Sequence, residues 1–368
     1  MLSILNILKK YHEEKKKNKG ETGKPEEPVS AIISGNAPKA NPEGVFPPGQ
    51  GQAENSGILA PEKKVPAESK LERASGLYKE LLDWAKKVYK LEFVLVPDFK
   101  ANFAAIIEKE LACLDSEGRE LLKLCLADYE IKEDALYYHV VNVSILVLEL
   151  GKGLGYEKQR LIELGTAGFM HDIGIIKFTE LINKNGKLNE EELRKVKEHP
   201  LSGLEILNKI GGEFTPGLID VISQEHERLD GTGYPKGIKD DEIKEFAQIV
   251  GLADVYEAMT HSRPYRLRFS PPKTMNTILN KKSEFSPKVL KIFLERIGIF
   301  PVGTMVRLNT KEIGVVAKEN FGLPLRPLVM VIFDENGNKL VAEKQIDLSS
   351  NLLICIEECM DISGDKVN

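Results

Sequence analysis

The stretch DALYYHVVNVSILVLEL, from Asp134 to Leu150, decides the fold class. It is apolar almost all round, and a helix that is apolar on every side is buried among other elements. The stretch is shorter than the roughly 20 apolar residues of a membrane span, and Asn142 lies inside it. We therefore predict a mainly α protein in which this segment is the central helix and carries His139.

Apolar residues at helical spacing continue on both sides of this segment. From Lys70 to about Leu150 their recurrence indicates a run of packed helices. A further helix should end at His171 and Asp172, where Gly174 lets the chain turn. These side chains would then lie at the end of a helix.

Two later helices are also indicated. One begins at Asn189, where Glu192 completes a capping-box pattern, and Pro200 interrupts it just after His199. The last large helix, around residues 246–260, places Asp254 and Glu257 on one face. The imidazole of His199 should therefore lie at a bend.

The two ends of the chain differ from this helical centre. Residues 20–69 hold eight of the 19 prolines, and such a composition buries too little apolar surface to fold. Beyond Phe300 the runs 302–308, 314–318 and 328–333 are of β type, and Asn336-Gly337 signals a hairpin. We predict a short amphipathic or frayed N-terminal segment (1–18), a disordered Pro/Gly-rich linker (19–69), a helical N-terminal subdomain (70–130), a catalytic helical domain (131–299) and a small β module (300–360).

Charge and cysteine content limit the function classes. The net charge of −5 argues against binding of polymeric nucleic acid, which needs an excess of Lys and Arg, but it allows a small anionic ligand. The four cysteines lack the spacing of a zinc or redox motif and should be reduced. With no membrane span and no cleavable leader pattern, we expect a cytoplasmic protein without a transmembrane segment.

Histidine is scarce, six in 368 residues, yet four of the six fall within 88 residues, in a region with acidic and turn-forming partners. One buried histidine is more often core than ligand, but facing helices of a bundle build metal sites from such sets. One ion could be held by His139, His171, Asp172 and Asp254, with Asp172 bridging to a second held by His199 and His226. Two ions about 4 Å apart can share a hydroxide and clamp a phosphodiester for in-line displacement.

Several separate motifs in order resemble the HD-GYP family of the HD superfamily over about residues 137–299. They are the strings His171–Gly174, Asn185–Leu188, His199-Pro200 with Gly203, His226–Pro235, Ala253–Tyr256 and Arg263–Arg266. The resemblance implies a helical HD-type core that hydrolyses cyclic di-GMP, or a related cyclic dinucleotide, at a site of two or three iron or manganese ions. Its implied metal ligands are His139, His171, Asp172, His199, His226 and Asp254.

The same resemblance implies substrate contacts. Arg263 and Arg266 match positions near the substrate, where a guanidinium fork suits a phosphate oxygen. Gly231–Pro235, which includes Tyr234, should form a tight exposed loop with a positive φ. This Gly-Tyr-Pro loop would shape the pocket, bind partners such as diguanylate-cyclase-type proteins, or be a plain turn.

Departures from the family pattern affect the same site. Ile175 stands where the family has a lysine that holds the scissile phosphate, so Lys177 could take this catalytic role only if the backbone turned it inward. Glu225 replaces the first of two adjacent histidines; it is either a ligand that lowers the positive charge or a solvent-facing residue. Ala135 replaces the glutamate of members with a third metal, so we expect two divalent ions at most. Glu257 replaces the usual aspartate.

Two main readings remain open. In the first the protein is a phosphodiesterase of cyclic dinucleotides with two divalent ions. In the second it is a catalytically degenerate signalling module that binds partners or ligand, as Ile175 and Glu225 would allow. Hydrolysis of nucleotide monophosphates is a weaker third reading, because the Gly-Tyr-Pro block and the two arginines would then have no use.

Overall fold

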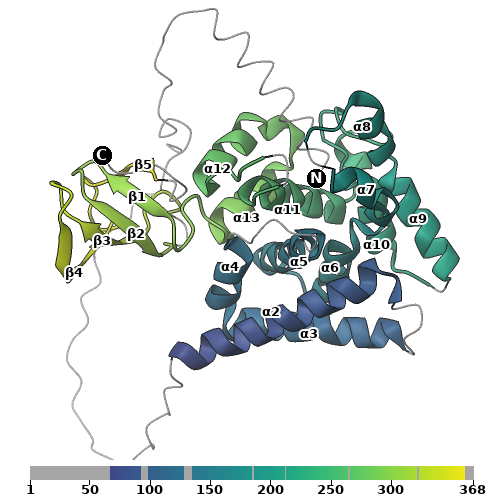
Figure 1. Ribbon diagram of the computed structural model, residues 1–368, viewed down its shortest axis with the longest axis horizontal. Helices are drawn as coiled ribbons and strands as arrows, with labels where there is room; N and C mark the ends of the chain where they lie inside the picture. The colour runs from purple at the N-terminus through teal and green to yellow at the C-terminus, as the bar shows by residue number, and fades with distance from the viewer. Residues whose placement is uncertain are drawn as a thin grey trace, which may run out of the picture. The chain divides into compact units, whose positions relative to one another are not determined.

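The computed structural model of the chain describes residues 67–92, 98–127, 135–184, 186–211, 213–263, 266–320 and 323–360 (Figure 1). The predicted N-terminal segment 1–18 and the linker up to residue 66 lie outside these residues. The linker was expected to reach residue 69, but helix α2 begins at Ala67. The Ala-Glu-Ser-Lys string after Pro66 consists of residues that helices accept, so the helix starts directly after the proline.

The described chain is mainly helical, as predicted. Its helical elements are α2 (Ala67–Tyr89), α3 (Phe99–Ser116), α4 (Gly118–Leu126), α5 (Ala135–Gly153), α6 (Lys158–Met170), η3 (Ile173–Phe178), α7 (Thr179–Ile182), α8 (Glu190–Val196), α9 (His199–Ile210), α10 (Pro216–Gln224), η4 (Asp240–Glu242), α11 (Glu245–Thr260), α12 (Pro271–Asn280), η5 (Lys282–Glu284) and α13 (Pro287–Arg296). The three η elements are short 3₁₀ helices.

Helix α5 is the central helix that its all-round apolar sequence predicts. It packs against α2, α4, α6, α11 and α13, and residues 139–151 are all buried. Figure 1 shows these helices gathered around α5. Among the described residues, no helix combines the length and apolarity that crossing a membrane requires.

The turn after α6 is shaped by a close backbone approach. α6 ends at Met170, and η3 follows directly after Asp172. A Cβ on Gly174 would lie 1.9 Å from the carbonyl oxygen of His199, a distance that no side chain could occupy. Glycine therefore lets η3 lie directly on the start of α9, which brings His171 and Asp172 toward His199.

The helix expected from Asn189 through His199 is two helices. The capping box is present, with Asn189 and Glu192 each accepting from the other's backbone N–H, but α8 ends at Val196. His199 begins α9, and Pro200 lies in the first turn of that helix. Proline fits there because the first helical N–H groups have no partner within the helix. The single-helix prediction was wrong in this detail, although His199 does lie at the bend.

The β module is an antiparallel sheet of five strands in the order β4-β3-β2-β1-β5. The strands are β1 (Met305–Leu308), β2 (Ile313–Lys318), β3 (Leu328–Phe333), β4 (Lys339–Asp347) and β5 (Ile356–Cys359). The first three confirm the predicted β runs, and Gly337, with φ 83°, lies in the turn between β3 and β4. β5 was not predicted, because the short strand IEEC carries two charges and no clear alternation.

One buried acid in the helical core gives a testable pH dependence. Glu110 of α3 is fully buried, accepts a 3.0 Å hydrogen bond from Ser144 Oγ, and burial raises its pKa from 4.5 to about 8. Because the pKa of Glu110 is higher in the folded chain than in the unfolded chain, raising the pH lowers the free energy of unfolding. This free energy is highest below about pH 4.5 and falls as the pH rises toward 8. Glu110→Gln should therefore stabilise the chain by on the order of 4 kcal/mol at about pH 8 and by little at about pH 5. Urea unfolding at both pH values tests this; an equal effect at both would contradict it.

Candidate metal centre

Seven buried side chains from five parts of the helical fold meet at one place. His139 comes from α5, His171 and Asp172 from the end of α6, His199 from the start of α9, Glu225 and His226 from the end of α10, and Asp254 from α11. Each is at most 1% exposed. The structure therefore brings together every residue that the sequence suggested as a metal ligand, including Glu225, which does not face solvent.

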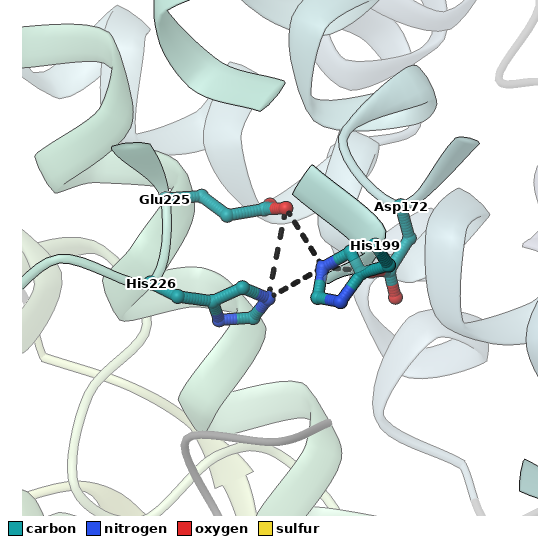
Figure 2. A group of neighbouring side chains, drawn as sticks. All are labelled: Asp172, His199, Glu225 and His226. Atoms are coloured by element: carbon teal, nitrogen blue, oxygen red, sulfur yellow. Dashed lines mark hydrogen bonds and ion pairs between the residues drawn. The ribbon is translucent and has the colours of Figure 1, made fainter. Parts of the chain in front are cut away.

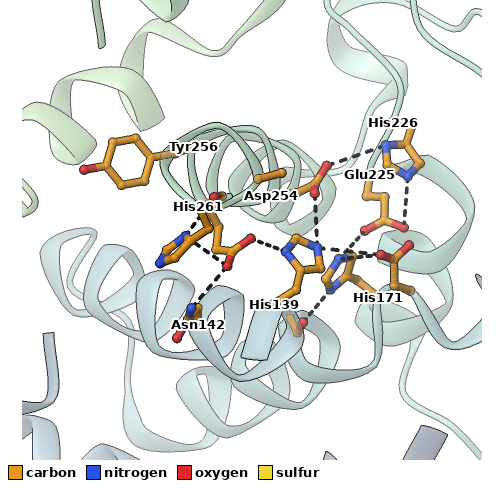
Figure 3. Close-up of polar contacts among 12 residues, drawn as sticks. His139, Asn142, His171, Glu225, His226, Asp254, Tyr256 and His261 are labelled. Carbon is orange, nitrogen blue, oxygen red and sulfur yellow. Dashed lines mark hydrogen bonds and ion pairs between the residues drawn. The ribbon is translucent and has the colours of Figure 1, made fainter. Parts of the chain in front are cut away.

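Three of these residues form a first group, His139, His171 and Asp254. His139 Nε2 lies 3.4 Å from Asp254 Oδ1, and the imidazole rings of His139 and His171 are 5.2 Å apart between centroids. Figure 3 shows these three side chains pointing toward one another. Their ligand atoms lie within 4.8 Å of one another, close enough to share one ion.

A second group consists of Asp172, His199, Glu225 and His226 (Figure 2). His199 Nε2 lies 3.3 Å from Asp172 Oδ1 and 3.7 Å from Glu225 Oε1. His226 Nε2 lies 3.7 Å from the same glutamate oxygen. Two imidazoles and two carboxylates around one point form a donor set that suits a transition metal.

Asp172 joins the two groups because each of its oxygens faces a different one. Oδ2 lies 3.6 Å from Nε2 of both His139 and His171, whereas Oδ1 faces His199 of the second group. A carboxylate placed in this way can ligate one ion with each oxygen. The sequence suggested a bridging role for Asp172, and this placement would permit it.

The hydrogen-bond inventory of these residues fits bound cations. Both oxygens of Asp172, both oxygens of Glu225 and Nε2 of His171 are buried without a hydrogen-bond partner. Buried polar atoms are rarely left in this state, because desolvating them costs about 1–3 kcal/mol each. The Nε2 atoms of His199 and His226 also face each other at 2.9 Å. A cation in each of the two ligand groups would satisfy these atoms.

Backbone carbonyls orient two of the histidines. His171 Nδ1 donates to the carbonyl of Gly168 at 2.7 Å, and His199 Nδ1 donates to that of Val196 at 2.9 Å. With the proton held at Nδ1, the lone pair of Nε2 points into the cluster. Metal-binding histidines are commonly fixed by this second hydrogen bond.

Burial also sets the protonation of the cluster. It lowers the pKa of His171, His199 and His226, which favours the neutral imidazoles that bind metals. Burial alone would raise the pKa of Asp172, but the neighbouring His171 and His199 hold it below its usual value. Burial and the charges of Asp172 and Asp254 raise the pKa of Glu225 well above its usual value. Without a cation, the Glu225 carboxylate is therefore less readily ionised than an ordinary glutamate.

Lys177 does not join the cluster. Its ammonium pairs with Glu205 of α9 at 2.6 Å, and the side chain is 38% exposed. The catalytic role suggested for Lys177 is therefore corrected, because η3 turns this residue toward solvent. The preceding Ile175 is fully buried.

The two arginines expected at the substrate are engaged in the protein. Arg266 donates to the carbonyls of Ala258 at 2.6 Å and Met259 at 3.2 Å, and so caps the end of α11. Arg263 is 3% exposed and donates to Glu257 Oε2 at 2.7 Å. Both guanidinium groups therefore donate hydrogen bonds to oxygen atoms of the protein.

Tyr234 is buried, although Gly231–Pro235 was expected to form an exposed loop. Its ring stacks on His226 with centroids 4.7 Å apart and an interplanar angle of 17°. Gly231 has the predicted positive φ, 77°. A Cβ on Gly233 would come within 2.4 Å of the backbone of Glu227, so only glycine allows this close return of the loop. The loop thus covers one wall of the cluster.

Two buried residues of the site were missed by sequence reasoning. Asn142 donates to Glu257 Oε1 at 3.1 Å, and His261 Nδ1 lies 3.1 Å from the same oxygen. Asn142 lies three residues after His139, and His261 lies four after Glu257. Helical spacing alone could have placed each of them beside a known site residue.

Comparison with protein families supports the helical core and the β module separately. A family model described as HD domain matches residues 106–289, half of the chain. A second model, described as KOW domain associated with HD domain, matches residues 305–366. The first match contains all seven residues of the cluster.

Two similar proteins are named as phosphodiesterases of cyclic dinucleotides. A cyclic di-GMP phosphodiesterase of Pseudomonas aeruginosa is 32% identical over 226 residues, 61% of this chain and 54% of that protein. A 3'3'-cGAMP-specific phosphodiesterase of Vibrio cholerae is 32% identical over 155 residues, 42% of this chain and 36% of that protein. This chain therefore spans about half or less of these relatives.

A solved structure shares the fold. The structure of an HDG"Y"P protein from Bdellovibrio bacteriovorus matches with a TM-score of 0.51 at 18% identity, covering 63% of this chain and 73% of that chain. At this level of identity the likeness shows a shared fold only. The family-model match, which covers half of the chain, shows that the chain belongs to the HD domain family.

Proposed function

We propose that this protein is a metal-dependent phosphodiesterase that hydrolyses a cyclic dinucleotide, with cyclic di-GMP as the expected substrate. One observation carries the proposal: seven buried histidine and acidic side chains form two adjoining ligand groups joined by Asp172. The names of the relatives support the substrate class, since they act on cyclic di-GMP or 3'3'-cGAMP. The products would be the linear dinucleotide or GMP.

The residues divide into two ligand groups with one shared member. His139, His171 and Asp254 would hold one ion, and His199, Glu225 and His226 the other, with Asp172 between them. Two divalent ions, iron or manganese for this imidazole and carboxylate set, supply activation of water near neutral pH and neutralisation of phosphate charge. Burial of the ligands excludes competing water from their inward-facing nitrogens and oxygens.

Glu225 lowers the positive charge of this centre. A histidine in its place would be neutral, so the carboxylate removes one unit of net charge next to the anionic diester. We therefore expect a weaker Michaelis complex than in a protein with two adjacent histidines. The carboxylate in turn strengthens cation binding through its charge.

Turnover of purified, manganese- or iron-loaded protein tests the proposal. Cyclic di-GMP and 3'3'-cGAMP are offered separately, and the products are identified by chromatography. We expect a linear dinucleotide or GMP from at least one of the two. Failure to form product from either, in protein that carries both ions, would refute the enzymatic function.

Removal of the ions should lower stability. An ion present at 100 times its dissociation constant stabilises the folded chain by about 2.7 kcal/mol per site, provided that it does not bind the unfolded chain. Calorimetry should therefore show a lower Tm after treatment with a chelator, with recovery after addition of Mn²⁺. An unchanged Tm would contradict metal binding at this cluster.

A second function is favoured by one observation. Ile175 supplies no positive charge beside the cluster, and Lys177 is paired with Glu205, so the scissile phosphate would lack the lysine that the family uses. The protein would then be a degenerate signalling module that binds ligand or a partner such as a diguanylate-cyclase-type protein. Because Tyr234 is buried, a partner would contact the exposed Thr232 of the Gly-Tyr-Pro loop and the exposed Lys236 that follows the loop.

A further inference from the structure

Glu257 lies on the opposite side of His139 from the ligand groups. It belongs to α11, one turn after Asp254, and is fully buried. Its Oε2 accepts a short hydrogen bond from His139 Nδ1 and a 2.7 Å bond from Arg263 Nη2. Nη2 of Arg263 lies 3.2 Å from His139 Nδ1, so the guanidinium and the imidazole share this one oxygen.

The other oxygen of Glu257 is held as well. Asn142 Nδ2 donates to Oε1 at 3.1 Å, and His261 Nδ1 lies 3.1 Å from it. Figure 3 shows the side chains of Asn142, His261 and His139 gathered in one place. A carboxylate with contacts to four side chains has little freedom to move.

The amide of Asn142 is itself fixed from the N-terminal side of the fold. Tyr78 of α2 donates its hydroxyl proton to Asn142 Oδ1 at 2.7 Å. A tyrosine hydroxyl that donates to Oδ1 leaves the NH₂ group to face Glu257. A continuous chain of buried contacts thus runs from α2 through α5 to α11.

The charge of Glu257 is balanced where it lies. Its carboxylate faces the guanidinium of Arg263 at 2.7 Å and the ring of His261 at 3.1 Å. The same carboxylate accepts the proton of His139 Nδ1. Nε2 then presents its lone pair toward Asp254 and Asp172, at 3.4 and 3.6 Å.

We propose that Glu257 is a positioning residue that fixes His139 as an Nε2 ligand, and that Arg263 holds Glu257 in place through Nη2. This inference rests on the proposed metal centre and adds to it a specific support for one ligand. It also gives Arg263 a role that follows from its contacts: an arginine 3% exposed, with its Nη2 on Glu257, is oriented toward the protein.

The first test measures metal binding and needs no turnover. The full chain and Glu257→Gln, which keeps the shape and removes the charge, are titrated with Mn²⁺ after chelation, and free ion is followed by electron paramagnetic resonance. Loss of a group that orients a ligand typically weakens metal affinity about 10- to 100-fold. We expect that loss at one of two sites; Glu257→Asp, the shorter acid, should recover part of it.

The matched control is Ser144→Ala. Ser144 lies on α5 like His139 and is buried in a hydrogen bond, but to Glu110 and the carbonyl of Gly165. Its loss should lower Tm and leave both manganese affinities unchanged. If a folded Glu257→Gln also keeps both affinities within about twofold, the positioning role is refuted. If the unaltered chain binds no manganese, the proposed metal centre itself fails.

The second test separates the two roles of the arginine. Arg263→Lys keeps the positive charge but loses the planar fork. Because the contact with Glu257 is made by that fork, the change should weaken manganese affinity and leave KM for cyclic di-GMP unchanged once the ions are saturating. A raised KM with unchanged metal affinity would show instead that Arg263 binds phosphate, and would overturn this part of the inference.

Discussion

Asp172→Asn is expected to remove most of the activity and at least one of the two ions. Asparagine keeps the volume of the side chain but replaces one anionic oxygen by an NH₂ group, which cannot bind a cation. Both oxygens of Asp172 face ligand groups, so each rotamer of the amide leaves one group incomplete. Substitution of a residue that only supports a metal ligand typically lowers metal affinity or activity about 10- to 100-fold. For the ligand Asp172 itself we therefore expect activity to fall by more than about 100-fold. Turnover and metal content of the same preparation test this.

Glu205→Gln is the control for that experiment. Glu205 lies on α9, the helix that carries His199, but its side chain is 61% exposed and pairs with Lys177. An exposed ion pair contributes little to stability, so this variant should keep its ions and its turnover. If Asp172→Asn retained two ions and full turnover, Asp172 would not be the bridging ligand.

The second large effect is expected from Ile175→Lys. Ile175 N donates to the carbonyl of Asp172 at 2.8 Å in the first turn of η3. In a 3₁₀ helix, side chains three residues apart lie on the same side, so residue 175 is placed next to Asp172. A lysine there would bring its ammonium group to the cluster. Loss of one preorganised hydrogen-bond donor typically lowers turnover by about 10² to 10³-fold, so the gain of one should have an effect of similar size. We expect a gain of that order in kcat.

Ile175→Met is the matched control, because it keeps an apolar side chain of similar size without charge. It should leave kcat unchanged, which separates the charge from a change in packing. If Ile175→Lys with Glu225→His creates activity that the unaltered chain lacks, the protein is the degenerate module in its natural form. A folded Ile175→Lys variant with no gain would show that the missing lysine does not limit turnover.

The central helix and the ligand set were accessible from sequence for different reasons. The segment of α5 is apolar on all sides, a pattern that only a buried helix satisfies. The candidate ligands were recognisable because histidine is scarce and because most of them, His139 excepted, stand in or beside a short motif. Asn189 with Glu192 specified a helix start through local hydrogen bonds, and the structure has it.

The corrections concern residues in turns and loops, where the direction of a side chain does not follow from helical periodicity. Arg263 pairs with Glu257, and this pairing depends on how the chain turns after α11 rather than on a local pattern. The direction of Lys177 depends on η3, a 3₁₀ helix whose turn is tighter than that of the α-helix that periodicity detects. Tyr234 stacks on His226 because the loop folds back on itself, which glycine at position 233 permits.

Anomalous diffraction from crystals of the manganese-loaded chain tests the central claim most directly. The account predicts two peaks about 4 Å apart on either side of the Asp172 carboxylate. One peak should lie at His139, His171 and Asp254, and the other at His199, Glu225 and His226. A single peak, or peaks away from these side chains, would contradict the two-metal centre.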